Sequence, residues 1–239
     1  MGRRPLRADA GPSPRFNGDS KGDSIERGSL LALVFPSTHP LVHCKIAILR
    51  SKSTEPPEFR RLVRSLSILL GQEATADLHL RPIQVTTPLG EAEGYEPDES
   101  IGIVPILRAG LGMSDGLLDL LPEAQVRHLG MFRDEISLKP MEYYNKLPAK
   151  PNISLALVVD PMLATGGSAI RACEILKGAG IPRIKFIGLI AAPEGIRALS
   201  RAMPDVAIHV GAVDDRLNEI GYIYPGLGDA GDRQFNTSD

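Results

Sequence analysis

The feature that most constrains the fold of this sequence is a buried-strand pattern that ends in a turn of small residues, residues 155–168. Residues 155–159 are an unbroken apolar run, Asp160 follows where the run stops, and residues 165–168 are Thr-Gly-Gly-Ser. A short, fully apolar run is typical of a strand buried on both faces of a parallel sheet. The spacing of apolar residues over 169–177 predicts an amphipathic helix next. We therefore expect a strand–turn–helix unit of an α/β fold.

The turn has the chemistry of a phosphate-binding site. It offers free backbone N–H groups at a helix N-terminus, the positive end of the helix dipole, and the hydroxyls of Thr165 and Ser168. At the carboxyl edge of the strand, Asp160 faces the same crevice and is suited to accept hydrogen bonds from ribose hydroxyls. An ordinary strand-to-helix turn is the alternative, because glycine and serine favour such turns for steric and capping reasons alone.

Apolar runs and amphipathic segments alternate from residue 101 onward. This alternation predicts a doubly wound, mostly parallel sheet flanked by helices, with its ligand crevice at the carboxyl ends of the strands. Residues 133–152 form a long connection without clear periodicity, and such a connection is often a lid over an active site. The expected strands are 101–107, 126–132, 155–159, 184–190 and 206–210, and the expected helices are 112–121, 168–179 and 193–203.

The first hundred residues lack the strand–helix alternation found after residue 101. Residues 1–30 contain glycine, proline and scattered charge but few large apolar residues, so we expect a disordered N-terminal arm. An organelle transit peptide is the weaker alternative, because the arm has acidic residues and no amphipathic arginine-rich stretch. A single domain over residues 31–239 follows. It opens with amphipathic helices near 38–49 and 58–71, a short helix near 72–80 and a hairpin within 82–100.

Composition excludes several classes of protein. The net charge of −2 argues against a broad nucleic-acid interface. The sequence has no stretch of 18 consecutive apolar residues, so no transmembrane helix is predicted. Cys44 and Cys173 lie far apart, so they indicate neither a disulfide framework nor a metal site, and the five histidines lack ligand spacing. A reducing compartment, the cytoplasm, is the default location.

Two arginines stand at the ends of expected strands. Arg108 ends one apolar strand and is followed by Ala109 and Gly110, whose small size lets the backbone approach a ligand. Its guanidinium is suited to bind diphosphate oxygens in a bidentate manner, although strand ends often carry solvated arginines. Arg133 similarly begins the long connection after residues 126–132.

Three segments together resemble one family. Residues 160–168, Asp-Pro-Met-Leu-Ala-Thr-Gly-Gly-Ser, are similar to the phosphoribosyl-pyrophosphate (PRPP) loop of type I phosphoribosyltransferases, with Pro161 in the place where these enzymes commonly have a second acid. That proline is typical of the uracil phosphoribosyltransferases. Residues 104–112 and 221–232 look like the other two signatures of that family. The resemblance covers residues 36–237, in three long motifs in the family's order.

The resemblance implies the fold and the site. It implies a type I phosphoribosyltransferase-like sheet with a β-hairpin arm, a flexible active-site loop after Arg133, and a C-terminal base-binding hood. The catalytic residues it implies are Arg108, Arg133, Asp160 and Asp229. The uracil-binding residues are Ile223, Gly228, Asp229 and Ala230, largely through main-chain groups. The PRPP-binding residues are Arg108, Ala109, Gly110, Arg133, Asp160, Pro161, Met162, Leu163, Ala164, Thr165, Gly166, Gly167, Ser168 and Asp229.

The function implied is conversion of uracil and PRPP to UMP and diphosphate in pyrimidine salvage. Mg²⁺ is the expected cofactor, held mainly by PRPP oxygens and water rather than by a metal site of the protein. Some relatives are activated by GTP, which the sequence leaves open here. We expect a homodimer or a homotetramer, with the two N-terminal helices as candidate contact surface.

Two other functions fit the same fold. One is a PRPP- and UMP-sensing regulator that binds RNA. It would need a basic face, and residues 31–239 have 21 basic against 25 acidic residues. The other is a catalytically silent relative that serves as a scaffold. The presence of Arg108, Arg133, Asp160 and Asp229 speaks against it.

Overall fold

The computed structural model describes residues 33–133 and 140–237, without the side chains of residues 132–133 and 140–141. The expected arm, residues 1–30, lies outside the described residues. So does part of the connection expected over residues 133–152.

The described residues are built around one mostly parallel sheet, as the sequence predicted. Every neighbouring pair of its strands is parallel except β6 and β7. The strands lie in the order β1 (Val34–Pro36), β11 (Ala207–Val213), β10 (Arg183–Ala191), β8 (Leu155–Val159), β4 (Ile101–Leu107), β6 (Leu129–Arg133) and β7 (Pro140–Asn145), with β5 (Gln125–Val126) beside β4 and β9 (Met162–Leu163) beside β10.

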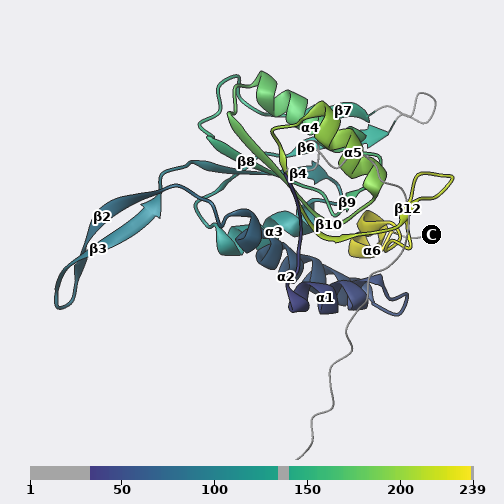
Figure 1. Ribbon diagram of the computed structural model, residues 1–239, viewed down its shortest axis with the longest axis horizontal. Coiled ribbons are helices and arrows are strands. Elements are labelled where there is room, and N and C mark those ends of the chain that lie inside the picture. Colours follow the sequence, from purple (N-terminus) through teal and green to yellow (C-terminus); the bar gives the residue numbers. More distant parts are fainter. Residues whose placement is uncertain (1–32, 134–139, 238–239) are drawn as a thin grey trace, which may run out of the picture.

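Helices cover both faces of the sheet (Figure 1). One face packs against α1 (Pro40–Arg50), α2 (Pro56–Ala74) and α3 (Leu111–Leu120), and the other against α4 (Gly167–Gly178) and α5 (Pro193–Ala202). Successive side chains of a strand point to opposite faces. In β8, accordingly, Leu157 and Val159 belong to the core under α2, and Ala156 and Val158 to the core under α4. Burial on both faces explains why the strand is apolar throughout.

A β-hairpin projects from this body, as expected (Figure 1). It consists of β2 (Leu80–Thr87) and β3 (Gly90–Pro97), paired antiparallel. The short helix expected near residues 72–80 was wrong: α2 continues to Ala74, whose side chain is fully buried, and β2 begins at Leu80. The apolar face of α2 is therefore longer than the sequence interpretation allowed.

The strand expected over residues 126–132 is two strands, β5 and β6, with a break between them. Ile103 accepts a hydrogen bond from the N–H of Arg127 at 2.9 Å. Pro105 lies two residues further along β4, and its backbone points to the same side of the strand, toward β5 and β6. Proline has no N–H to donate there. The ladder is therefore interrupted beside Pro105 and resumes at the pair Ile106 and Leu129.

Several short elements escaped the sequence interpretation. The 133–152 connection contains β7, which pairs antiparallel with β6. Each of the missed elements is only two to six residues long, so local periodicity gives little signal. The others are β1, β9, β12 (Arg216–Leu217), β13 (Ile223–Tyr224) and α6 (Ala230–Phe235). None of the helices in the described ranges is both long and apolar enough to cross a membrane.

Candidate active site

The phosphate turn, defined here as residues 161–168, runs from the end of β8 into α4. Main-chain bonds hold it to β10: Leu189 and Ile190 donate to the carbonyl of Pro161 at 3.0 and 3.1 Å. Gly166 precedes α4 with a φ of 85°, a left-handed conformation that suits glycine. No side chain caps the helix. The turn therefore presents the start of α4 at the carboxyl end of the sheet, as a phosphate site requires.

The first turn of α5 packs directly beneath the phosphate turn. A Cβ atom at Gly195 would lie 2.4 Å from the carbonyl oxygen of Ala164 and 2.5 Å from that of Leu163. No side chain fits there, so Gly195 lets α5 support the turn by backbone contact. The sequence interpretation missed this residue, because an isolated glycine near a helix start has no distinctive pattern.

Asp160 lies at the carboxyl end of β8, as predicted, and shares the crevice with Asp229. It is partly buried, and its Oδ1 accepts a hydrogen bond from the N–H of Met162 at 3.4 Å. Burial raises the pKa of Asp160 to about 7; the Met162 N–H acts against this shift, and the negative charge of Asp229 adds to it. The two carboxylates, 69 positions apart in the sequence, therefore interact electrostatically.

The pyrophosphate loop, residues 108–110, lies beside Asp160. A Cβ atom at Gly110 would lie 2.5 Å from the carbonyl oxygen of Val159, so the loop packs against the last residue of β8. The peptide bond between Leu107 and Arg108 is cis. Arg133, the last residue of β6, lies on the same edge of the sheet, because β6 runs parallel to β4. Its side chain is outside the described residues.

The guanidinium of Arg108 contacts the C-terminal helix α6. Its Nη2 forms an ion pair with Oδ1 of Asp232 at 2.7 Å, and its Nη1 donates to Oγ1 of Thr237 at 3.3 Å. It also lies 5.9 Å from the ring centre of Phe235. The side chain is about half exposed, so these contacts leave it open to an anion in the crevice.

The base turn, residues 223–230, contains the four residues that the family resemblance assigned to the base. Ile223 and Ala230 are buried, and Gly228 has a φ of 78°. Asp229 caps α6, its Oδ1 accepting from the N–H of Asp232 at 2.9 Å. The four residues therefore occupy one tight segment, next to Arg108 and Asp160.

Side chains from outside the base turn hold it in place. Arg50 donates to the carbonyl of Gly226 at 2.8 Å and forms an ion pair with Asp214, which in turn accepts from the N–H of Gly226. Arg233 donates to the carbonyls of Leu49 and Leu227 at 2.8 and 2.7 Å. The sequence interpretation assigned no role to Arg50 or Arg233, because the carbonyls they contact leave no trace in a sequence.

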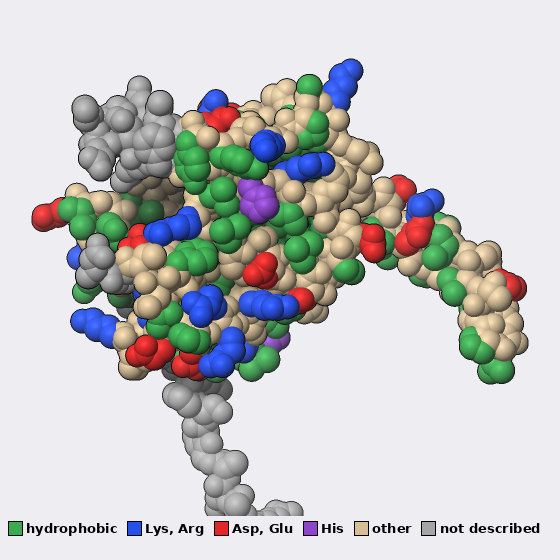
Figure 2. Space-filling view, turned by 180° about the vertical axis from the view of Figure 1, so that it is seen from behind, with side chains coloured by type: hydrophobic (Ala, Val, Ile, Leu, Met, Phe, Trp, Pro, Cys, Tyr) green, Lys and Arg blue, Asp and Glu red, His purple; other side chains and the backbone are tan. Residues whose placement is uncertain are grey.

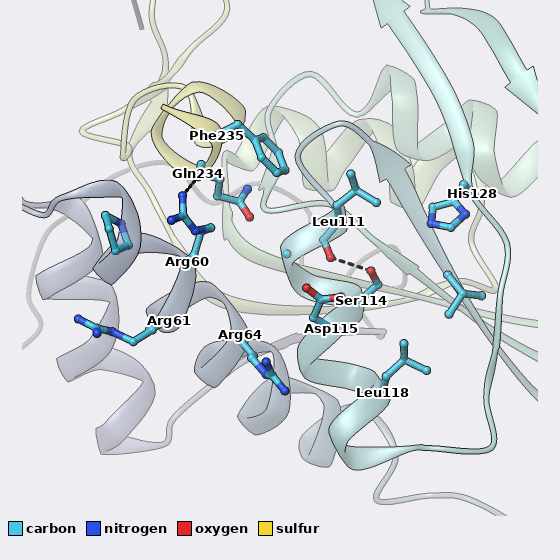
Figure 3. Close-up of a pocket in the computed structure, with 13 residues that line it drawn as sticks. Arg60, Arg61, Arg64, Leu111, Ser114, Asp115, Leu118, His128, Gln234 and Phe235 are labelled. Atoms are coloured by element: carbon cyan, nitrogen blue, oxygen red, sulfur yellow. Dashed lines mark hydrogen bonds between the residues drawn. The ribbon is translucent and has the colours of Figure 1, made fainter. Parts of the chain in front are cut away.

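A cavity of about 810 Å³ lies beside this crevice, between α2, α3 and α6 (Figure 3). Arg60, Arg61 and Arg64 of α2 line one side, and Leu111 and Leu118 of α3 the other. Among the described side chains, no group of three or more His, Cys, Asp or Glu residues is arranged to hold a metal ion.

Comparison with known proteins gives one family. The model of the uracil phosphoribosyltransferase family matches residues 36–237. A uracil phosphoribosyltransferase of Roseiflexus castenholzii is 59% identical over 204 residues, which are 85% of this chain and 98% of that protein. One of Listeria monocytogenes is 51% identical over 208 residues, 87% of this chain and 100% of that protein. The solved structure of the AQ2163 protein from Aquifex aeolicus superposes with a TM-score of 0.80 at 39% identity, covering 86% of this chain and 99% of that chain.

Proposed function

Because this chain belongs to the uracil phosphoribosyltransferase family, we propose that it converts uracil and PRPP to UMP and diphosphate, the step that returns free uracil to the nucleotide pool. The observation that carries the proposal is the convergence of three segments on one crevice. The phosphate turn, the pyrophosphate loop and the base turn meet around Asp160 and Asp229, although they lie far apart in the sequence.

The crevice has one group for each part of PRPP. The main-chain N–H groups at the start of α4, with Thr165 and Ser168, bind the 5′-phosphate. Asp160 accepts hydrogen bonds from the ribose hydroxyls. Arg108 and Arg133 neutralise the diphosphate, Arg108 by exchanging its contact with Asp232 for the stronger charge of the leaving group.

The reaction needs positioning more than covalent chemistry. The bond from C1′ to the diphosphate oxygen breaks with its electron pair going to that oxygen, N1 of uracil bonds to C1′ from the opposite face, and the N1 proton passes to water. The configuration at C1′ changes from α to β. The protein holds the two substrates in line, excludes water from the cationic sugar and stabilises the leaving charge.

The donor set of the crevice suits Mg²⁺. This ion keeps several waters and takes one or two carboxylates together with substrate phosphates. Asp160 and Asp229 supply two carboxylates, and PRPP oxygens and water supply the remaining ligands. When bound, Mg²⁺ offsets the negative charge of the diphosphate.

Choice of the base rests on main-chain groups of the base turn. Uracil presents an acceptor, a donor and an acceptor along O2, N3–H and O4. A rigid turn offers the complementary groups, so cytosine would oppose like groups at N3 and at its amine. Leaving buried polar groups unpaired supplies discrimination on the order of 10⁴.

Cellular location, oligomeric state and activation complete the proposed function. We propose a cytoplasmic homodimer or homotetramer, and GTP as a candidate activator. An RNA-binding regulator is less well supported, because Lys and Arg are interspersed with Asp and Glu on the face seen in Figure 2.

The test is UMP formation from uracil and PRPP, with and without Mg²⁺ and with and without GTP. UMP that forms only with Mg²⁺ supports the proposal. Absence of UMP under every condition, from a folded protein that binds PRPP, would sink it and favour the regulator. A rate that is unchanged by GTP removes GTP as an activator.

A further inference from the structure

One buried amide side chain joins the two halves of the candidate active site. Gln234 belongs to α6 and is fully buried. Its Nε2 donates to the carbonyl of Ala109 at 2.9 Å and to the carbonyl of Ala230 at 3.1 Å. Ala109 is in the pyrophosphate loop, and Ala230 closes the base turn. A single NH₂ group therefore spans the segments that hold the two substrates.

The opposite side of the amide is enclosed by α3. A Cβ atom at Gly112 would lie 2.1 Å from Oε1 of Gln234, so only glycine lets the amide fit. Oε1 is buried and has no hydrogen-bond partner. The reverse assignment of the amide would bring an oxygen against both carbonyls, so the two hydrogen bonds fix its orientation.

The main chain of Gln234 is held as well. Nη1 of Arg60, in α2, donates to its carbonyl at 2.6 Å, the contact drawn in Figure 3. Gln234 is thus fixed to α2 through its backbone and to both substrate segments through its side chain. The pyrophosphate loop is anchored independently, because Gly110 donates to Ile106 and packs against Val159. The base turn has its own anchors in Arg50 and Arg233, and the Gln234 side chain is the contact that ties its last residue to the pyrophosphate loop.

We propose that Gln234 is a positioning residue that sets the base turn at its working distance from the pyrophosphate loop, an inference that rests on the proposed function. It touches neither substrate. It acts by holding the main-chain groups that bind uracil in register with C1′ of PRPP. Small misplacements of reacting groups cost catalysis heavily, up to about 10²-fold for 1 Å.

The test variant is Gln234→Met, which keeps the length and volume of the side chain but donates no hydrogen bond. We expect the KM for uracil to rise about tenfold, from the loss of two buried hydrogen bonds, while the KM for PRPP changes less than about threefold. Ser67→Ala is the matched control: Ser67 is equally buried, but its hydroxyl donates only to Val63 within α2. Its kinetic constants should equal those of the parent. Equal uracil KM values for Gln234→Met and the parent would overturn the proposal.

A second variant separates positioning from packing. Gln234→Glu keeps the shape but places a carboxylate against two carbonyls, so it should impair uracil use more than Gln234→Met at about pH 8. Protonation restores one donor, and burial raises the pKa of such a carboxyl. Its activity relative to the parent should therefore rise as the pH falls toward about 6. A ratio that does not change with pH contradicts the bridge.

Hydrogen exchange of the substrate-free protein distinguishes this proposal from the proposed function. In Gln234→Met, amides of residues 228–230 should exchange faster than in the parent, with residues 155–159 unchanged. If the parent makes no UMP yet exchange follows this pattern, the proposed function fails and the bridge stands. If the parent makes UMP but residues 228–230 exchange at the same rate in Gln234→Met as in the parent, the bridge fails and the proposed function stands.

Discussion

The phosphate turn and the base turn lie in one crevice but are held in different ways. Main-chain hydrogen bonds to β10 and backbone contact with Gly195 hold the phosphate turn. Side chains hold the base turn: Arg50 and Arg233 bind its carbonyls, and Gln234 joins its end to the pyrophosphate loop. The first is set by the sheet, and the second by α1, α6 and the loop before β12.

This difference separates two requirements of the reaction. A phosphate group needs a rigid row of N–H donors, which a strand–turn–helix unit provides from consecutive residues. A base needs a particular edge to be matched, which side chains from several elements adjust without altering the sheet. Changes at Arg50 of α1 or Arg233 of α6 should therefore alter base binding and leave PRPP binding nearly unchanged.

Replacing Arg108 should have the largest effect, because its half-exposed guanidinium is the proposed diphosphate ligand and also pairs with α6, which follows the base turn. Arg108→Ala removes a charge that faces the diphosphate and also the ion pair with Asp232 of α6. We expect kcat/KM to fall about 10²–10³-fold, the usual cost of losing one electrostatic stabiliser of the transition state. Steady-state kinetics with both substrates measure it. Arg64→Ala, which breaks an exposed ion pair with Asp119, is the control and should change kcat/KM little.

Gly228→Val should impair the base turn selectively, by about 10²-fold in kcat/KM for uracil. A valine strains a backbone with a φ of 78° and adds a side chain where main-chain groups must meet the base. PRPP binding, measured by calorimetry, should survive.

Gly180→Val is the matched control for Gly228→Val, since Gly180 has a φ of 83° with nothing within 4 Å of an added Cβ and lies beyond α4. Normal uracil kinetics in Gly228→Val would mean that the base is bound elsewhere. A base panel on the parent adds a second check: 5-fluorouracil should be accepted and cytosine rejected.

Asp160→Asn should act on the opposite substrate. A charged acceptor that binds sugar hydroxyls contributes about 1.5–3 kcal/mol, so PRPP use should weaken roughly 10–150-fold, with less change in uracil binding. Asp205→Asn is the control, because Asp205 pairs with Lys177 on the surface. If the PRPP KM and kcat both stay at the parent's values, Asp160 serves the fold rather than the reaction.

The same contrast explains what the sequence could predict. The strands β4, β8 and β10 and the phosphate turn follow from continuous residues with a strong local pattern, and the structure confirms them. β13 and α6 have only two and six residues. α6 is held by contacts with distant residues: Arg60 donates to the carbonyl of Gln234, and Arg233 of α6 donates to that of Leu49. No local signal predicts such elements.

The candidate site divides in the same way. Asp160, Arg108 and Gly110 could be placed at strand ends from periodicity alone. The residues of the base turn came from family resemblance. Gly195 and Gln234 escaped both, because their importance lies in their contacts. Gly195 packs against two carbonyls of the phosphate turn, and Gln234 joins the pyrophosphate loop to the base turn. Such contacts become visible only once the chain is folded.

The smallest expected effect is a pH-dependent change in stability that links the two regions. Because the pKa of Asp160 is raised to about 7, the folded state binds a proton that the unfolded state has released, and stability falls as the pH rises from about 4 through about 7. Asp160→Asn removes this dependence. Its Tm should exceed that of the parent at about pH 8.5, and the difference should narrow toward about pH 5. Asp205→Asn should instead lower the Tm relative to the parent at about pH 8.5, because the hydrogen bond from Lys177 lowers the pKa of Asp205.

The charge of Asp229 adds to the raised pKa of Asp160. In an Asp229→Asn background, the Tm gain from Asp160→Asn should therefore begin to narrow at a lower pH. If this background leaves the pH dependence of the Tm difference unchanged, the two regions do not interact electrostatically and the shared crevice loses its support.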